Sequence, residues 1–65
     1  MGILAVNFDK SRAIIAVRKG RASWWIDGRQ YGNDKPKEHA LWHFEDLLGW
    51  KHPVCNDVSR FLRAA

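Results

Sequence analysis

The sequence predicts an α+β fold: a small antiparallel β-hairpin sheet of three to four strands, followed by two α-helices packed on one face. Two observations predict it. Residues 1–32 carry short apolar runs with the two-residue period of strands, separated by turn residues. After the segment Gly32–Pro36 the apolar period becomes helical. We therefore expect a single domain over residues 1–65, with the hairpin sheet in 1–32 and a helical part in 36–65.

The first hairpin is predicted at the start of the chain. Apolar residues recur at every second position over residues 3–8, and residues 9–12 form a turn. The run 13–17 is short and rich in β-branched residues, which favours a strand. The alternative is a helix capped within that turn and running through residues 13–19, which so short an apolar run leaves open.

The second hairpin has the strongest local signal. After a turn at residues 19–21 and a strand at 22–26, Asp27-Gly28 suits a two-residue type I′ turn, which needs positive φ at both positions. That turn predicts the cross-strand pairs Ile26–Arg29, Trp25–Gln30 and Trp24–Tyr31. One face of the sheet then holds Ala22, Trp24 and Ile26, and the other holds Ser23 and Trp25. The last strand is expected to be very short.

Two helices are predicted after the sheet. Pro36 suits the first turn of a helix, and Gly49 suits its end. The apolar stripe of this helix is Ala40, Leu41, Phe44, Leu47 and Leu48. A second helix should begin at Asn56 or Asp57, which are good N-caps. Its stripe is Val58, Phe61, Leu62 and Ala65.

The charge distribution points to an anionic partner. The chain has 11 Lys and Arg against 7 Asp and Glu, a net charge of +4. The whole excess lies in residues 1–35, and residues 36–65 are neutral. A one-sided positive field favours nucleic acid, an acidic protein face or a lipid surface. No run is long or apolar enough for a signal peptide or membrane span, so we expect a cytoplasmic protein that is not in the membrane.

The leading hypothesis is nucleic-acid binding through a basic and aromatic sheet surface. Cationic groups neutralise phosphates, and exposed rings stack on bases. The candidate residues are Arg18, Lys19, Arg21, Trp25 and Arg29. The alternative interpretation is that these cations only solvate an edge strand. The small size and high Trp content are common among phage and plasmid accessory proteins, which would fit a regulatory role.

A second nucleic-acid signal lies near the C-terminus. The segments Leu47–Gly49 and Val58–Leu62 resemble the Leu-Gly and Val-Ser-Arg-x-Leu rhythm of bacterial helix-turn-helix proteins. The connection is longer than usual and contains Pro53. The resemblance implies that Arg60 and Arg63 face DNA together with Asn56 and Ser59. The alternative is a plain pair of helices closing over the sheet.

The runner-up function is a protein-binding module, such as an inhibitor or adaptor, that docks through exposed Trp25 or Trp42. Trp42 lies nearly opposite Phe44 on the predicted helix, so it either packs under the segment around Trp50 and Pro53 or meets a partner. An acidic protein partner would suit the positive charge. A homodimer built on Trp42 is compatible with either function.

Metal binding and catalysis are disfavoured. A zinc site would use His39, His43, His52 and Cys55, but their order matches no usual zinc pattern. The single cysteine also excludes a disulfide within one copy. Cys55 with His52, and Glu45 with Asp46, lack an oriented third group. We therefore predict no cofactor and no enzymatic activity.

Overall fold

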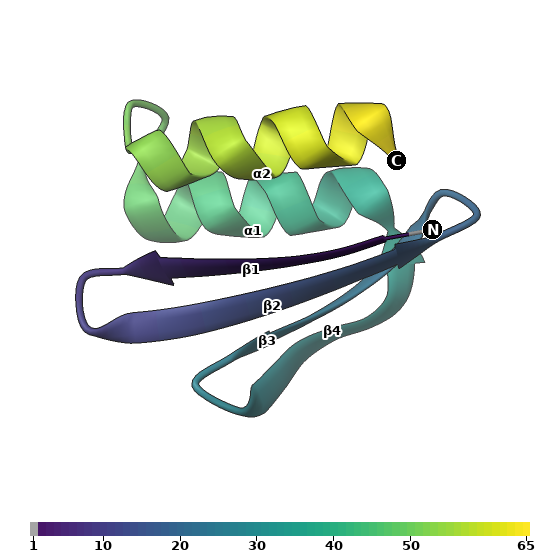
Figure 1. Ribbon diagram of the computed structural model, residues 1–65, viewed down its shortest axis with the longest axis horizontal. Coiled ribbons are helices and arrows are strands. Elements are labelled where there is room, and N and C mark those ends of the chain that lie inside the picture. Colours follow the sequence, from purple (N-terminus) through teal and green to yellow (C-terminus); the bar gives the residue numbers. More distant parts are fainter. Residues whose placement is uncertain (1) are drawn as a thin grey trace.

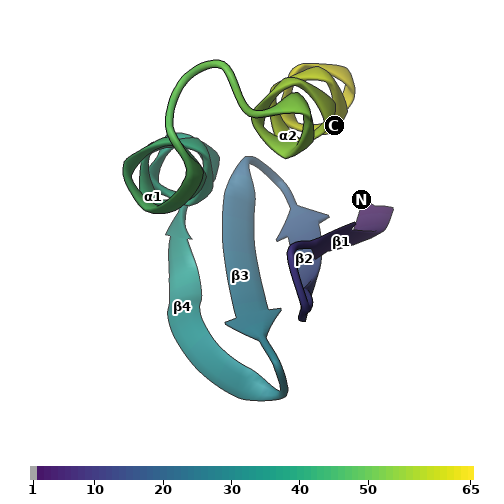
Figure 2. The same ribbon diagram turned by 90° about the vertical axis from the view of Figure 1, so that its left-hand side faces the viewer.

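The structure, a computed structural model, describes residues 2–65. Its elements are β1 (Gly2–Phe8), β2 (Ser11–Arg18), β3 (Arg21–Ile26), β4 (Arg29–Pro36), α1 (Lys37–Leu48) and α2 (Pro53–Ala64). The strands form one antiparallel sheet in the order β1-β2-β3-β4, and both helices lie on the same face of it (Figures 1 and 2). The predicted α+β class is confirmed. The prediction of a very short last strand is wrong, because β4 spans eight residues. None of the helices over residues 2–65 is long and apolar enough to cross a membrane.

Each hairpin turn has two residues. Lys19-Gly20 and Asp27-Gly28 have positive φ throughout, as type I′ geometry requires, which confirms the turn expected at Asp27. The first turn is Asp9-Lys10, shorter than the four residues expected. The helical alternative over residues 13–19 is wrong, because residues 11–17 of β2 pair with β1 and residues 13–18 pair with β3.

The register of β4 departs from the prediction at one point. Ile26 pairs with Arg29 and Trp25 with Gln30, as expected, but Trp24 pairs with Gly32 and not with Tyr31. The β3–β4 ladder is irregular here. A Cβ at Gly32 would lie 2.4 Å from the Trp24 ring. The indole therefore occupies the space above residue 32, which only glycine leaves free.

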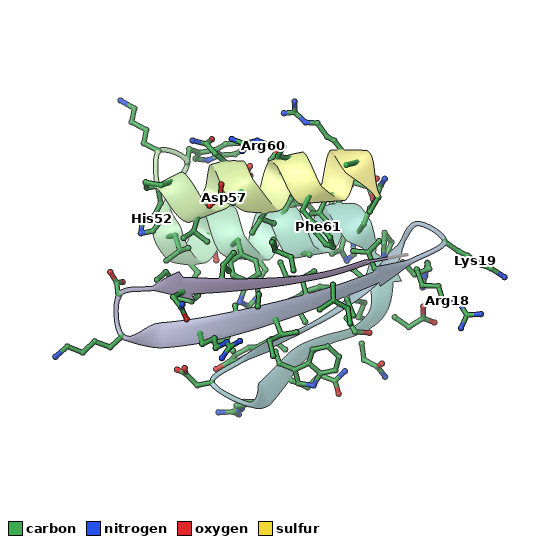
Figure 3. The ribbon with its side chains drawn as sticks, in the orientation of Figure 1. Arg18, Lys19, His52, Asp57, Arg60 and Phe61 are labelled. Carbon is green, nitrogen blue, oxygen red and sulfur yellow. The ribbon has the colours of Figure 1, made fainter. Side chains whose placement is uncertain are left out.

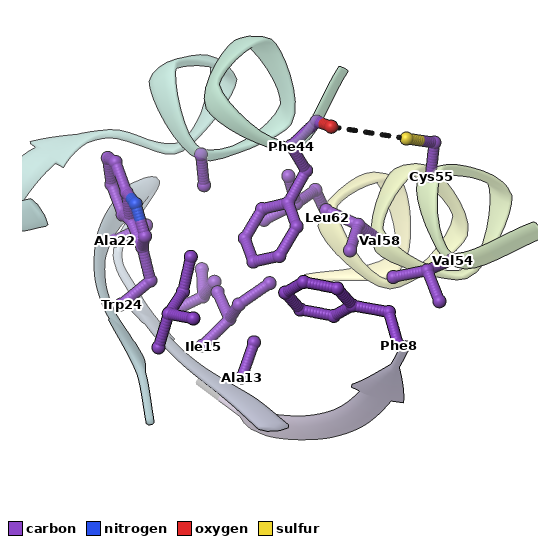
Figure 4. Close-up of a cluster of buried hydrophobic side chains, with 13 residues drawn as sticks. Phe8, Ala13, Ile15, Ala22, Trp24, Phe44, Val54, Cys55, Val58 and Leu62 are labelled. Carbon is purple, nitrogen blue, oxygen red and sulfur yellow. Dashed lines mark hydrogen bonds between the residues drawn. The ribbon is translucent and has the colours of Figure 1, made fainter. Parts of the chain in front are cut away.

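The core lies between the covered sheet face and the helices. Ala22, Trp24 and Ile26 are all buried there, as the alternation predicted. Phe44 of α1 is fully buried, and its ring meets the edge of Phe8 with centroids 6.1 Å apart (Figure 4). From α2 the core receives Val54, Cys55, Val58 and Leu62.

The helix predictions need two corrections. Leu47 is not a core residue, because 51% of it is exposed. The second helix begins at Pro53, earlier than Asn56 or Asp57, because His52 caps it: the Val54 amide donates a hydrogen bond to His52 Nδ1 at 3.1 Å. Ala65 lies just beyond the end of α2 and is exposed.

Candidate nucleic-acid interface

The sheet face that the helices do not cover is the candidate site, and we call it the open face. Alternate residues of each strand point to it, and the antiparallel register aligns them in rows across the strands. Two rows form an apolar band in the middle. One row contains Ala5, Ile14, Trp25 and Gln30, and the other contains Ile3, Ala16 and Ser23. Ile3 is 74% exposed, so this band is presented to solvent.

Arginines lie at the two ends of the open face. Along β2 the alternation places Arg12, Ile14, Ala16 and Arg18 on the same side. Arg12 and Arg18 are both exposed and are separated by about 20 Å, at roughly 3.3 Å per residue. Arg18 pairs across the ladder with Arg21, and Lys19 lies in the adjoining turn (Figure 3). The open face is therefore an apolar band with an arginine at each end, and at the Arg12 end the Asp27 carboxylate also accepts a hydrogen bond from the Arg12 backbone N–H at 3.0 Å.

The surface between the band and the Arg18 end is hollowed. A shallow hollow of about 450 Å³ lies there, and its lining includes Ile3, Ala16, the cations Arg18, Lys19 and Arg21, and the acid Asp34. Small side chains at Ala16 and Ser23 leave this space between larger neighbours. Part of a ligand's surface can therefore sit against apolar groups while its charges meet the cations.

Arg21 is partly neutralised by an acid. Its Nε lies 3.1 Å from Asp34 Oδ1, and its Nη2 donates a hydrogen bond of 2.6 Å to the Asp34 carbonyl oxygen. Both side chains are exposed, so water screens this pair. Arg18, Lys19 and Arg12 have no ion pair among residues 2–65. These three carry most of the free positive charge at the open face.

Trp25 is on the open face but is half-buried and not an exposed ring. Its cross-strand neighbours are Ile14 and Gln30. A second hollow is lined by Trp25 with Arg12, Ile14, Asp27 and Gly28. One side of the indole therefore remains reachable near Arg12.

Arg29 does not belong to the open face. It pairs with Ile26, whose side chain is on the covered face, and its guanidinium lies 5.7 Å from the centre of the Tyr31 ring. Tyr31 in turn meets His43 of α1 with ring centroids 5.4 Å apart. The register expected from the Asp27-Gly28 turn already placed Arg29 opposite Ile26. The sequence alone therefore indicated that Arg29 lies on the same face as Ile26 and not on the face of Trp25.

The helix-turn-helix interpretation is wrong. The two helices run antiparallel and side by side over the sheet (Figure 1). In a helix-turn-helix motif the two helices instead cross at about 90–120°. The exposed side chains of Arg60 and Arg63 line a shallow groove with Asn56 and Ser59 on the outer side of α2. Arg60 lies on the side of α2 away from the open face (Figure 3) and also borders a groove beside β1. These arginines therefore do not share a surface with the open face.

Trp42 is uncovered. It is 58% exposed, and its ring lies beside His39 with centroids 5.0 Å apart. The segment around Trp50 does not return to cover it, because Trp50 is itself 75% exposed.

The four candidate zinc ligands each make contacts with other parts of the fold. His52 caps α2, and Cys55 is buried with its Sγ 3.1 Å from the Gly49 carbonyl oxygen and 3.4 Å from that of Phe44. His43 packs against the ring of Trp24, while His39 packs on Trp42. Within residues 2–65, no three His, Cys, Asp or Glu side chains are grouped so as to hold a metal ion.

Burial raises the pKa of the Cys55 thiol, and the Glu45 carboxylate adds to this effect. The folded state therefore favours the neutral thiol. The free energy of unfolding should fall as pH rises above the pKa of an unfolded thiol, about 8.5, and this loss should end at the higher folded pKa. Urea denaturation at several pH values measures it. Cys55→Ala should show a smaller decline over that window, and an equal decline in both proteins would contradict this account.

Comparison with known proteins assigns no relative. No protein-family model matches this chain, and no curated protein or solved structure matches it significantly. A function must therefore be argued from the open face itself.

Proposed function

We propose that this protein binds double-stranded nucleic acid through the open face of its sheet, mainly by contacts to phosphates. The observation that supports this most is the separation of Arg12 and Arg18 on one uncovered strand face. Their Cα atoms are about 20 Å apart, so the two long side chains can reach separate phosphates of one duplex at the same time. Lys19 adds a further cation at the Arg18 end.

The apolar band fits the centre of such a contact. Ile14 and Ala16 lie between the two arginines on an inner strand, and a four-stranded sheet is too wide to enter the major groove, so they would rest against the duplex backbone and not against the bases. This composition predicts weak sequence preference, because phosphate contacts carry no sequence information. A single half-buried indole gives little area for stacking, which disfavours unpaired strands as the target.

Binding measured at several salt concentrations tests the proposal. Fluorescence anisotropy with a labelled duplex should give an affinity that falls steeply with salt, with a log–log slope of about −3 if Arg12, Arg18 and Lys19 each neutralise one phosphate. The matched single strand should bind more weakly. If no duplex binds at about 50 mM salt, the proposed function is wrong.

Exposed Trp42 supports a second candidate, docking on another protein. An indole that is 58% exposed on a helix is a typical interface anchor. Trp42→Ala separates the two functions, because Trp42 is on α1 and not on the open face. Duplex binding should be unchanged in this variant. A loss of duplex binding would indicate that the nucleic-acid site lies on the helical layer and not on the open face.

A further inference from the structure

The edge of β1 is unusually open to another strand. β1 is the first strand of the sheet order, so within residues 2–65 no strand pairs with its outer side. Its sequence Gly2–Phe8 contains no charged residue and no proline, and all seven residues pair with β2 in one unbroken register. Edge strands of this kind present free N–H and C=O groups at alternate residues and readily pair with further strands.

The opposite edge is protected, which makes the contrast informative. β4 contains Arg29, Asp34 and Lys35, ends at Pro36 and has an irregular register. Charges, proline and bulges are the usual means of preventing edge-to-edge pairing. This chain uses them on β4 and not on β1.

A groove follows the β1 edge. It has a volume of about 430 Å³ and is lined by Leu4, Ala5 and Val6 of β1 and by Asp57, Arg60 and Phe61 of α2. Consecutive β1 residues belong to both faces of the sheet, so the groove lies at the edge of the strand. Phe61 projects from α2 toward β1 (Figure 3) and is only partly buried. An added strand would place apolar side chains against this ring.

We propose that the occupant of this groove is β1 of a second copy, so that the protein forms a two-fold symmetric dimer with one continuous eight-stranded sheet. Antiparallel pairing about Ala5 places Leu4 of one copy beside Val6 of the other. Leu4 and Val6 are partly exposed in one copy, and both would be covered in the dimer. A two-fold contact requires that one surface complements itself.

The charges in the groove meet that requirement. α2 runs antiparallel to β1 (Figure 1), so Asp57 lies toward the Phe8 end and Arg60 toward the Gly2 end. A two-fold axis at Ala5 reverses this order in the second copy. Asp57 then faces Arg60 of the partner subunit, and the same pair forms again across the axis. Opposite charges at this spacing favour the second copy as the partner.

The proposed dimer does not depend on nucleic-acid binding, but it would enlarge the surface available for it. Pairing through β1 keeps the two open faces on the same side of the continuous sheet. Two sets of Arg12 and Arg18 would then lie along one surface. The dimer should form without nucleic acid, so its absence and a failure to bind duplexes are separate results.

Sedimentation of the full chain across a concentration series tests the dimer. We expect a species of twice the 7.5 kDa chain mass. Ala5→Lys should raise the dimer dissociation constant by about tenfold or more, since the new charges would lie directly opposite each other. Gln30→Lys adds the same charge to the same face at the β4 edge and should leave the constant unchanged. Circular dichroism of each variant checks that a loss of dimer is not a loss of fold.

Exchange of the groove charges gives an independent check. Asp57→Arg and Arg60→Asp should each weaken the dimer, because like charges then face each other. The double variant, with both changes, should restore it. A wild-type chain that stays monomeric up to about 1 mM overturns the proposal. Equal weakening by Ala5→Lys and Gln30→Lys, or failure of the double variant to restore dimerisation, does so as well.

Discussion

Replacing Phe44 with alanine is expected to lower the free energy of unfolding by about 3–5 kcal/mol, which is the usual cost of truncating a buried Phe. Phe44 is fully buried, and its ring meets the edge of Phe8. Typical stabilities of 0.05–0.15 kcal/mol per residue give roughly 3–10 kcal/mol for a chain of this length. The loss is therefore a large part of the total, and the urea midpoint of the variant should fall well below that of the wild type.

Trp42→Ala is the matched control for this prediction. It removes a larger ring from the same helix, but that ring is 58% exposed. Urea denaturation should show a change of about 0.5 kcal/mol or less, as for most surface substitutions. Similar losses at Phe44 and Trp42 would contradict the placement of the core between α1 and the sheet.

Reversing the charge of both end arginines should nearly abolish duplex binding. If Arg12 and Arg18 each neutralise one phosphate, release of counterions at about 50 mM salt contributes roughly tenfold in affinity per contact. The double variant Arg12→Glu and Arg18→Glu should then bind about 100-fold more weakly, and its salt slope should fall by about two. Both side chains are exposed, so the fold should be retained.

The control reverses two exposed charges in the helical layer, Lys51→Glu and Arg63→Glu. It changes the net charge by the same amount. Neither residue is on the open face or in the β1 groove. Fluorescence anisotropy should show a loss well below that of the Arg12 and Arg18 variant. Equal losses would mean that net charge, and not the open face, determines affinity.

Local sequence signals predicted most of the fold. Asp27-Gly28 defined the turn, and the alternation of Ala22, Trp24 and Ile26 identified the buried face. The Trp24–Gly32 pairing could not be predicted, because it depends on how the indole fills the space above a glycine in the folded sheet. Capping by His52 was also missed, since histidine is a rare N-cap.

The candidate site was predicted less well. The basic and aromatic pattern drew attention to Arg29, and the helix-turn-helix resemblance drew attention to Arg60 and Arg63. The sheet and α2 place these residues on other surfaces. Arg12 and Ile14 were overlooked, although the two-residue period of β2 aligns them with Arg18. Composition gives the total charge, whereas the strand period determines which charges share a face.

The most direct test of the open face is an NMR titration of the labelled protein with a short duplex. The largest shift changes should occur in β2 between Arg12 and Arg18 and at the Trp25 indole N–H, because these groups are on the uncovered side of the sheet. Changes centred on the outer side of α2 around Arg63, or around Trp42, with β2 unaffected, would contradict the account.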